Sequence, residues 1–255
     1  MLPLSKAKLK TFASLQTKKY RQKHRLFVVE GKKMVREALS SRFPVHAVVF
    51  SKDRQENNAG LIKTVSSLQS YLASPADFQL ISSLQQPEGV LAVLQLPERY
   101  LSLAPLSELP SGKGLILDAI QDPGNLGTLI RTADWFGIKQ IVCLKGTVDC
   151  FNPKVLRSSM GSIFRVNIIY VDVWERGIAS HANQIWIADM EGDALGEVKF
   201  GANDWLLLGN EANGVGDKLR EVPEIQKVHI PGRGGAESLN VGIAGGILLW
   251  ELTQG

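Results

Sequence analysis

Three glycine-containing loops hold the polar side chains that could bind a ligand. In the first, residues 118–127, Asn125 and Gly127 begin an expected helix, and Arg131 follows about one turn later. The free N–H groups of a helix start attract anions, and a planar guanidinium suits a phosphate. The spacing therefore indicates a phosphate-bearing ligand. Taken alone, however, a capped helix with an exposed arginine is the favoured interpretation.

The second loop, residues 209–216, directly follows an apolar strand. Its glycines permit a tight turn or the close approach of a ligand to the backbone. No third glycine completes a dinucleotide fingerprint, and no Gly-Lys-Ser/Thr follows as in a P-loop. Because Glu211 repels phosphate, hydroxyl groups or a cation are the expected partners of this loop.

The third loop, residues 230–240, opens the last helix of the chain. Ser238 is expected to cap that helix, and Glu237 to complement its positive end. This interpretation leaves Asn240 unexplained, because asparagine has a poor helix propensity. An exposed glycine inside a helix costs about 1 kcal/mol relative to alanine, so we expect another backbone to cross this helix closely at its glycines. These are Gly242, Gly245 and Gly246.

Each loop follows an expected strand, at 115–117, 205–208 and 227–230. In the same half of the chain, strands are also expected at 140–144, 166–170 and 185–188, and helices at 126–136, 153–164, 173–182 and 239–252. Ligands bind beyond the carboxyl ends of parallel strands. The second half is therefore predicted to be an α/β domain whose loops form a site.

The first half alternates in the same way. Strands are expected at 26–29, 45–50 and 89–96, and helices at 31–41, 59–68 and after Pro75, behind a basic surface helix at 4–15. This pattern predicts a smaller α/β domain with one central sheet. A segment rich in proline and glycine, residues 97–114, marks a linker between the two halves.

Charge is concentrated at the N-terminus. The first 36 residues carry 11 Lys or Arg and a single acid, Glu30, whereas the whole chain of 255 residues has a net charge of only +4. A run of like charges is usually a solvated face. Here the near absence of acids favours a contact with nucleic acid instead.

Composition excludes several other classes. With 44% apolar and 21% charged residues, the chain is globular and neither disordered nor collagen-like. No apolar run reaches the roughly 20 residues of a membrane span, and lysines interrupt the N-terminus where a secretory signal would be apolar. Cys143 and Cys150 alone predict a reducing compartment and hence a cytoplasmic protein. Four scattered histidines predict no metal site, and no Gly-x-Ser-x-Gly elbow supports a covalent hydrolase.

Four motifs, in order along the second half, resemble those of the SpoU class of the SPOUT superfamily, the trefoil-knotted RNA ribose 2′-O-methyltransferases. They are Asn125-Leu126-Gly127 with Arg131-Thr132-Ala133, Arg157-Ser158-Ser159-Met160-Gly161, Gly209-Asn210-Glu211, and Ile230-Pro231 with Glu237-Ser238-Leu239-Asn240-Val241. Each motif alone is weak, but four at normal spacing are specific. The first half, above all Leu26-Phe27-Val28-Val29-Glu30-Gly31, is similar to the ribosomal-protein-like RNA-binding domain often fused to these enzymes.

The resemblance implies an RNA substrate-binding domain at 1–97, a linker at 98–112 and a methyltransferase domain at 113–255. It also implies a mostly parallel sheet with a C-terminal trefoil knot, S-adenosyl-L-methionine as the cofactor, and a homodimer. General topology rules would have rejected a knot. A knot would explain the helix glycines, because a threaded chain needs close backbone crossings. Many relatives carry Ser or Ala where Gly242 stands, a departure that concerns packing.

Carried over by position, the resemblance assigns three groups of residues. The cofactor would be contacted by Gly209, Asn210, Ile230 and Leu239. The acceptor ribose would be held, activated or enclosed by Asn125, Arg131, Glu211, Ser238 and Asn240. Arginine is too weak a base to take the 2′-hydroxyl proton, so Arg131 is expected to stabilise the developing alkoxide and the adjacent phosphate. RNA would be bound by Lys18, Lys19, Tyr20, Arg21, Lys23, Arg25, Lys32, Lys33 and Arg36.

Three functions remain open from the sequence. The favoured one is a ribose 2′-O-methyltransferase of structured RNA, either ribosomal or transfer RNA. The second is a non-catalytic RNA-binding or ribosome-assembly factor on the same fold, which gives no physical reason to retain Asn125, Arg131, Glu211 and Asn240. The third is an enzyme of small nucleotides, which leaves the basic segment unexplained and lacks a phosphate loop.

Overall fold

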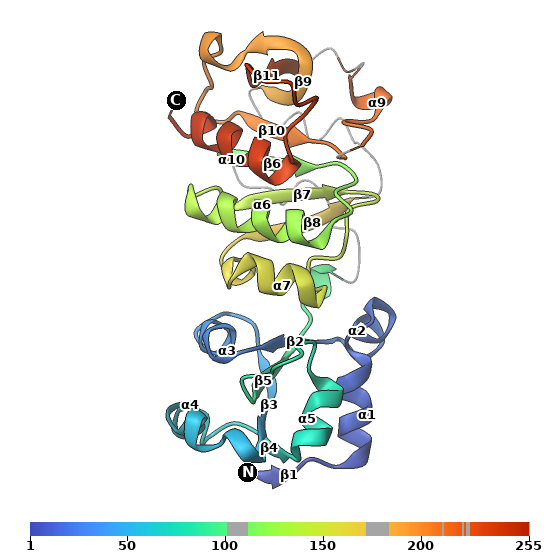
Figure 1. The fold of residues 1–255 in the computed structure, drawn as a ribbon, viewed down its shortest axis with the longest axis vertical. Helices are drawn as coiled ribbons and strands as arrows, with labels where there is room; N and C mark the ends of the chain where they lie inside the picture. Colours follow the sequence, from blue (N-terminus) through green and yellow to red (C-terminus); the bar gives the residue numbers. More distant parts are fainter. Residues whose placement is uncertain (101–111, 172–183, 211, 221, 223–224, 255) are drawn as a thin grey trace. The chain divides into compact units, whose positions relative to one another are not determined.

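A segment from the middle of the chain folds with its N-terminal part. In the computed structural model (Figure 1), contacts group residues 1–101 and 149–164 into one unit, the N-terminal unit, and residues 102–148 and 165–255 into another, the C-terminal unit. The structure describes residues 1–100, 112–171, 184–210, 212–220, 222 and 225–254. In the sequence, segment 149–164 stands between two strands of the C-terminal sheet. By its contacts, however, it belongs to the N-terminal unit.

The N-terminal unit is built on a five-stranded mixed sheet in the order β1-β4-β3-β5-β2. Its strands are β1 Leu2–Pro3, β2 Leu26–Glu30, β3 Val45–Ser51, β4 Ser70–Ala73 and β5 Val90–Gln95. Its helices are α1 Lys6–Ser14, α2 Lys18–His24, α3 Lys32–Leu39, α4 Ala59–Thr64, α5 Pro75–Ile81 and α7 Pro153–Ser159. Alternate residues of β3 face opposite sides. Ala47 and Val49 join the core with Phe12 of α1, while Val48 and Phe50 are buried on the other face.

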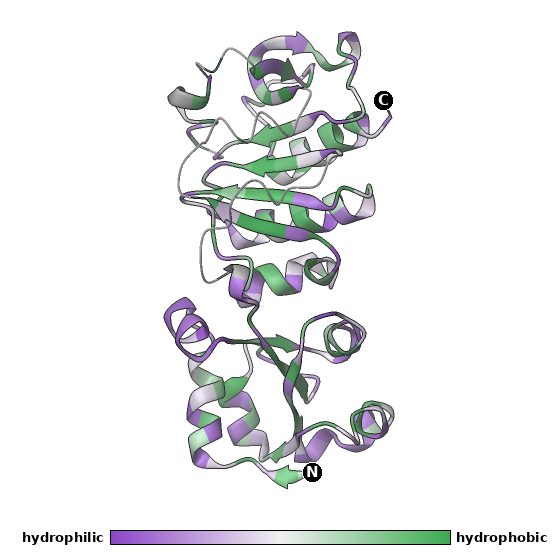
Figure 2. Cartoon of the chain, turned by 180° about the vertical axis from the view of Figure 1, so that it is seen from behind, coloured by the Kyte–Doolittle hydropathy of each residue, from purple (hydrophilic) through white to green (hydrophobic). Residues whose placement is uncertain are grey.

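The C-terminal unit has a six-stranded sheet in the order β11-β9-β10-β6-β7-β8, with every neighbouring pair parallel. Its strands are β6 Gly114–Leu117, β7 Gln140–Leu144, β8 Asn167–Val171, β9 Ile185–Ala194, β10 Trp205–Leu208 and β11 Ile225–His229. Its described helices are α6 Pro123–Trp135, α9 Asp217–Arg220 and α10 Val241–Leu252. The central strands β6, β7 and β10 are buried along their whole length and almost continuously apolar (Figure 2), as is typical of a sheet covered on both faces. The predicted α/β fold with a mostly parallel sheet is confirmed.

Several expected helices have different bounds, and two of them carry predicted motifs. The helix expected at 153–164 ends at Ser159, because Met160 adopts the left-handed conformation with φ 50°, and a short 3₁₀ turn, Ser162–Phe164, follows. The last helix begins at Val241 and is capped by Asn240, whose Oδ1 accepts the N–H of Gly242 at 2.9 Å. The predicted cap, Ser238, was therefore wrong. A cap is a favoured place for asparagine, which explains Asn240. The helix expected at 173–182 lies outside the described residues.

The glycines of α10 have different surroundings, so one explanation does not account for all of them. A Cβ at Gly245 would overlap the side chain of Leu129 in α6 and lie 2.9 Å from Leu208 Cδ1, whereas a Cβ at Gly246 would meet open space. The nearest described neighbours of Gly245 are thus side chains and not the crossing backbone that we expected. Among the described residues, no helix is both long and apolar enough to cross a membrane. The same residues contain no cluster of three His, Cys, Asp or Glu side chains that could hold a metal ion.

Candidate active site

The loops that follow β6 and β10 start side by side at the carboxyl edge of the C-terminal sheet. These two strands are neighbours in register, with Leu117 paired to Leu208. The third loop leads into α10, which packs on both α6 and β10. The sheet topology therefore brings together three loops that are far apart in the sequence.

Asn210 holds the two strand-end loops together. Its side-chain amide donates to the carbonyl of Ala119 at 3.0 Å, and its Oδ1 accepts the N–H groups of Ala212 and Asn213 at 3.0 and 3.2 Å. Its backbone N–H and carbonyl both bond to Gly214, at 2.9 and 2.8 Å. Asn210 therefore shapes this turn rather than offering a free polar group. The same turn requires a glycine at 209, since a Cβ on Gly209 would overlap the backbone of Gly214.

Asp118 and Ala119 tie the same loops together, although the sequence reasoning assigned them no role. Asp118 Oδ2 accepts the N–H of Gly216 at 2.9 Å, and the Asp118 N–H donates to the Leu208 carbonyl at 2.8 Å. Ala119 has φ 53°, a left-handed conformation that costs a non-glycine residue of the order of 1 kcal/mol. The bond from Asn210 holds Ala119 in that conformation. A carboxylate directly after a buried strand was the signal that could have identified Asp118.

Asn125 and Asn240 meet across the start of two helices. The Asn240 side-chain amide donates to Asn125 Oδ1 at 3.1 Å, while Asn240 Oδ1 caps α10. Asp122 caps α6 by accepting the N–H of Asn125 at 2.9 Å. The positive ends of α6 and α10 therefore lie near the two amides, and such ends stabilise negative charge. The structure brings together these two predicted catalytic residues.

Arg131 lies on the exposed side of α6, one turn before Trp135. Within the described part of the chain, its guanidinium has no hydrogen-bond or ion-pair partner, so it is available to a ligand. Residues 231–240 are exposed throughout, including Ser238 and Leu239, and Ile230 before them is half-buried. Glu211 lies outside the described residues.

Asp189 is a candidate ligand-binding residue that the sequence reasoning missed. The last pair between β9 and β10 is Ile187 with Leu207, and Asp189 lies two residues further along β9. Its side chain is only 6% exposed, its Oδ1 accepts the Glu191 N–H at 3.0 Å, and its Oδ2 has no hydrogen-bond donor among the described residues. A buried acceptor without a donor is uncommon and fits a ligand that carries N–H or O–H groups.

Two cations balance the charge of Asp189. Arg220 and Lys227 lie 3.6 and 3.7 Å from its Oδ2, which is too far for a hydrogen bond. A hydrogen bond to Glu191, helped by the charge of Asp189, raises the pKa of Lys227 and keeps it protonated. No spacing motif links these residues, because the middle of β9, the short helix α9 and the strand β11 supply them separately.

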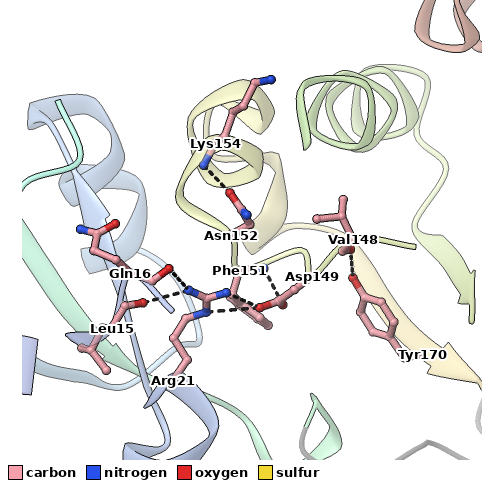
Figure 3. A network of polar contacts seen from close by, with 9 residues as sticks. All are labelled: Leu15, Gln16, Arg21, Val148, Asp149, Phe151, Asn152, Lys154 and Tyr170. Carbon is pink, nitrogen blue, oxygen red and sulfur yellow. Dashed lines mark hydrogen bonds and ion pairs between the residues drawn. The ribbon is translucent and has the colours of Figure 1, made fainter. Parts of the chain in front are cut away.

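The predicted RNA contacts divide into exposed and buried side chains. Arg21 is only 3% exposed (Figure 3): its Nε and Nη2 donate to Asp149 Oδ2 at 3.2 and 2.5 Å, and its Nη1 donates to the carbonyls of Leu15 and Gln16, each at 2.9 Å. The prediction that Arg21 contacts RNA phosphate is therefore wrong. The other basic side chains are exposed except Lys32, which is half-buried; the exposed residues are Lys18, Lys19, Tyr20, Lys23, Arg25, Lys33 and Arg36.

The motif that begins at Arg157 belongs to the N-terminal unit. Arg157 Nη1 donates to the Ser83 hydroxyl at 2.6 Å, and Gly161 packs against the Glu37 side chain. Phe151, from the same segment, packs with Phe27 of β2 at a ring-centroid distance of 4.5 Å. Segment 149–164 is therefore fastened to the N-terminal sheet by polar and aromatic contacts.

The chain is similar to known methyltransferases over almost its whole length. The SpoU rRNA Methylase family matches residues 113–250, and the MRM3-like substrate binding domain matches residues 6–92. The 23S rRNA (guanosine(2553)-2′-O)-methyltransferase RlmP of Bacillus subtilis is 35% identical over 96% of this chain and 95% of its own. The 23S rRNA (uridine(2479)-2′-O)-methyltransferase of Streptomyces viridochromogenes is 28% identical over 89% of this chain and 82% of its own.

Solved structures agree with these matches. The AdoMet-bound rRNA methyltransferase of Sinorhizobium meliloti superposes with a TM-score of 0.84 and 28% identity. The alignment covers 100% of this chain and 97% of that one.

Proposed function

Since this chain belongs to the SpoU rRNA methylase family, we propose that it methylates a ribose 2′-hydroxyl in ribosomal RNA of the large subunit. It is an S-adenosyl-L-methionine-dependent RNA 2′-O-methyltransferase. The observation that carries the ribosomal assignment is the likeness to the Bacillus subtilis enzyme, which extends over 96% of the chain and so includes the substrate-binding half.

The carboxyl edge of the C-terminal sheet fits the cofactor. When bound, S-adenosyl-L-methionine supplies a methyl group activated by a sulfonium ion. Asp189 Oδ2 offers a buried acceptor to the ammonium, amine or hydroxyl groups of the cofactor. Gly209, Ile230 and Leu239 would contribute backbone groups, as the family resemblance implies.

The acceptor ribose must lose the proton of its 2′-hydroxyl as the oxygen bonds to the methyl carbon. In our proposal, Arg131 stabilises the developing alkoxide and the neighbouring RNA phosphate, and an oxygen of that phosphate takes the proton, since arginine is no base. Asn125 and Asn240 orient the ribose where two helix N-termini favour negative charge. Ser238 and Glu211 stay predicted members of the same site.

The exposed basic residues of α2 and α3 would bind RNA outside the site. Lys18, Lys19 and Lys23 are exposed on a helix without an acid, and Tyr20 beside them offers a ring to an unstacked base. Two further exposed cations, Lys33 and Arg36, lie on α3. RNA is thus the macromolecular partner of this chain.

An apolar helix face supports the proposed homodimer. On α10, Ile243, Ile247 and Trp250 recur at helical spacing and are 57%, 38% and 53% exposed, and Trp135 of α6 is 83% exposed. A helix that is apolar on all sides is normally covered. A second copy of the chain is the proposed cover, because a self-complementary face suits a two-fold dimer. Such a contact would lie one helical turn from Arg131.

A single charge tests this dimer. In sedimentation experiments, Trp250→Glu should have the mass of a monomer. The control is Leu80→Glu, which changes a 63% exposed leucine of the N-terminal unit and should keep the mass of a dimer. Equal masses for both variants and the wild type would contradict the proposed face.

We keep the division at 1–97, 98–112 and 113–255 as a proposal, with the addition that segment 149–164 packs in the N-terminal unit. The C-terminal trefoil knot and a cytoplasmic location also stay predictions.

Labelled methyl transfer to total RNA, followed by mapping of the modified ribose, tests the proposed function. We expect one position in large-subunit ribosomal RNA; modification of transfer RNA alone, or of a base, would contradict the substrate assignment. Calorimetry with S-adenosyl-L-methionine accompanies the assay. A chain that binds neither this cofactor nor a methyl acceptor would instead fit the non-catalytic alternative.

A further inference from the structure

Lys145 is an exposed cation at the carboxyl edge of the C-terminal sheet, outside the residues assigned to methyl transfer. It directly follows β7, a strand that is buried along its whole length. Strands β6 and β7 are parallel neighbours, and their last register pair is Leu117 with Cys143 (Figure 1). At Lys145 the chain therefore leaves the sheet beside the start of loop 118–127, which leads to Asn125.

A tight turn fixes the backbone of Lys145. The N–H of Thr147 donates to the carbonyl of Leu144 at 3.1 Å, which closes a turn over residues 144–147. The third residue of this turn, Gly146, has φ 95°, a left-handed value that glycine adopts without strain. Lys145 is the second residue of the turn and is exposed, so it lies at the tip.

Buried hydrogen bonds fasten this turn to the loop that follows β6. Thr147 is buried, and its hydroxyl donates to the Leu117 carbonyl at 3.0 Å and accepts the Ile120 N–H at 3.3 Å. The N–H of Val148 donates to the Ile120 carbonyl at 2.9 Å. The turn is therefore fixed to the same loop that positions one of the two asparagines of the site.

The turn also touches the residue that Asn210 holds. A Cβ on Gly146 would lie 3.1 Å from the Cβ of Ala119, closer than an ordinary van der Waals contact. The carbonyl of Ala119 accepts the side-chain amide of Asn210 at 3.0 Å. A chain of contacts thus connects the turn of Lys145 to loop 209–216, and every residue in it belongs to the C-terminal unit.

The charge of Lys145 is not balanced by an acid. Within the described part of the chain, its ammonium group has no hydrogen-bond or ion-pair partner. In the neighbouring loop, the carboxylate of Asp118 accepts the Gly216 N–H at 2.9 Å, and that of Asp122 caps α6. An exposed cation without a counter-charge attracts an anionic ligand.

The order of the strands indicates which anion Lys145 binds. The loops predicted to contact the cofactor follow β10 and β11, on one side of β6, whereas Lys145 follows β7 on the other side. The loop between them carries Asn125, which would hold the acceptor ribose. A phosphate of the RNA strand is therefore favoured over the carboxylate of the cofactor.

We infer that Lys145 binds a phosphate of the substrate RNA at the carboxyl end of β7, and so gives the C-terminal unit an RNA contact of its own. This inference rests on the proposed function, because it describes how that unit holds the strand to be methylated. Lys145 contributes to the affinity for RNA, and the methyl transfer itself is left to the residues of the site.

The test is Lys145→Gln, with binding to transcribed large-subunit ribosomal RNA measured over a series of salt concentrations. We expect the Kd to rise roughly 2- to 5-fold, the size of one exposed ion pair. The slope of log K against log salt should fall by about 0.7 to 0.9, the share of one phosphate contact. Lys145→Arg keeps the charge and should bind like the wild type.

The matched control is Lys199→Gln. It removes another exposed lysine of the C-terminal unit, in the segment that leads into β10, and should leave both the Kd and the salt slope unchanged.

Three results would overturn this inference. An unchanged Kd and salt slope for Lys145→Gln would show that no phosphate binds there. A weaker Kd for S-adenosyl-L-methionine in calorimetry, with RNA binding intact, would assign Lys145 to the cofactor instead. Equal losses in Lys199→Gln would reduce the effect to net charge.

The proposed function fails by a different result. If the wild-type chain binds this RNA but methylates none of it, the proposed function is wrong, while the binding comparison of Lys145 and Lys199 still stands.

Discussion

Two arginines that the sequence predicted to meet RNA have opposite surroundings in the two units. Arg21, in the N-terminal unit, is buried, and its side chain bonds to one carboxylate and two carbonyls. Arg131, in the C-terminal unit, is exposed and has no partner among the described residues. Both lie on helices and both looked equally available in the sequence.

The difference shows what makes an arginine available for chemistry. A guanidinium whose donors are already used cannot take a phosphate without leaving a carboxylate and two carbonyls unsatisfied. A guanidinium held on the open side of a rigid helix bears no such cost. The donors of Arg21 are thus already used inside the N-terminal unit, while Arg131 stays available on the surface of α6 in the C-terminal unit.

The largest expected effect follows from removing the free arginine. Arg131→Ala should lower kcat about 10²- to 10³-fold, the usual loss when a group that stabilises developing charge is removed. Calorimetry should show an unchanged Kd for S-adenosyl-L-methionine. Arg131→Lys, which keeps the charge without the planar fork, should recover part of the rate. Methylation by Arg131→Ala at the wild-type rate would remove this residue from the site.

The next effect separates an asparagine of the site from an asparagine that only caps a helix. Asn240 caps α10, and Asn152 caps α7 by accepting the N–H of Lys154 at 2.9 Å. Replacing either by alanine should cost about 1 kcal/mol of unfolding free energy. Only Asn240→Ala should also lower kcat, roughly 10-fold or more, because it loses its bond to Asn125.

Asn125→Ala completes this comparison, since Asn125 is not a cap. It should lower kcat more than it weakens cofactor binding. Equal kcat values for the Asn240 and Asn152 variants would show that the amide pair has no part in turnover.

A smaller effect is expected at the exposed lysines. Replacing Lys18, Lys19 and Lys23 with Glu should raise the KM for RNA and reduce the slope of log K against log salt by about 2 to 3, because each lost phosphate contact removes roughly 0.7 to 0.9. The kcat at saturating RNA should change little, because these lysines lie outside the methyl-transfer site of the C-terminal unit. An unaltered salt slope would mean that RNA binds elsewhere on the chain.

The smallest effect on activity concerns the packing of α10 on α6, the helix that carries Arg131. Gly245→Ala should destabilise the protein by about 1 to 3 kcal/mol, because the added methyl group overlaps Leu129, two residues before Arg131 on α6. Its neighbour is the matched control. Gly246→Ala meets open space and should be neutral or stabilise by up to about 1 kcal/mol. Urea denaturation measures both, and equal values would show that α6 does not pack on α10 as described.

Sequence reasoning succeeded where one residue type and its spacing carry a strong local signal. The apolar runs of β7 and β10 predicted those strands to the residue, because no other element suits so short a buried run. The cap of α10 was misplaced by two residues, from Asn240 to Ser238, since both residue types cap helices well. The sequence reasoning missed Asp189, because its significance comes from burial and from Arg220 and Lys227.

The sequence by itself determined the two α/β halves and the family, and it predicted the motif residues of the site. These depend on local patterns: periodicity, strand-end loops and their glycines. Only the tertiary structure decided that Arg21 is buried, that Asn125 meets Asn240, and that segment 149–164 packs with the N-terminal sheet. The physical reason is that burial and hydrogen-bond partners are set by residues distant in sequence. Arg21 and Asp149 are 128 positions apart, and no local pattern in either segment reveals the other.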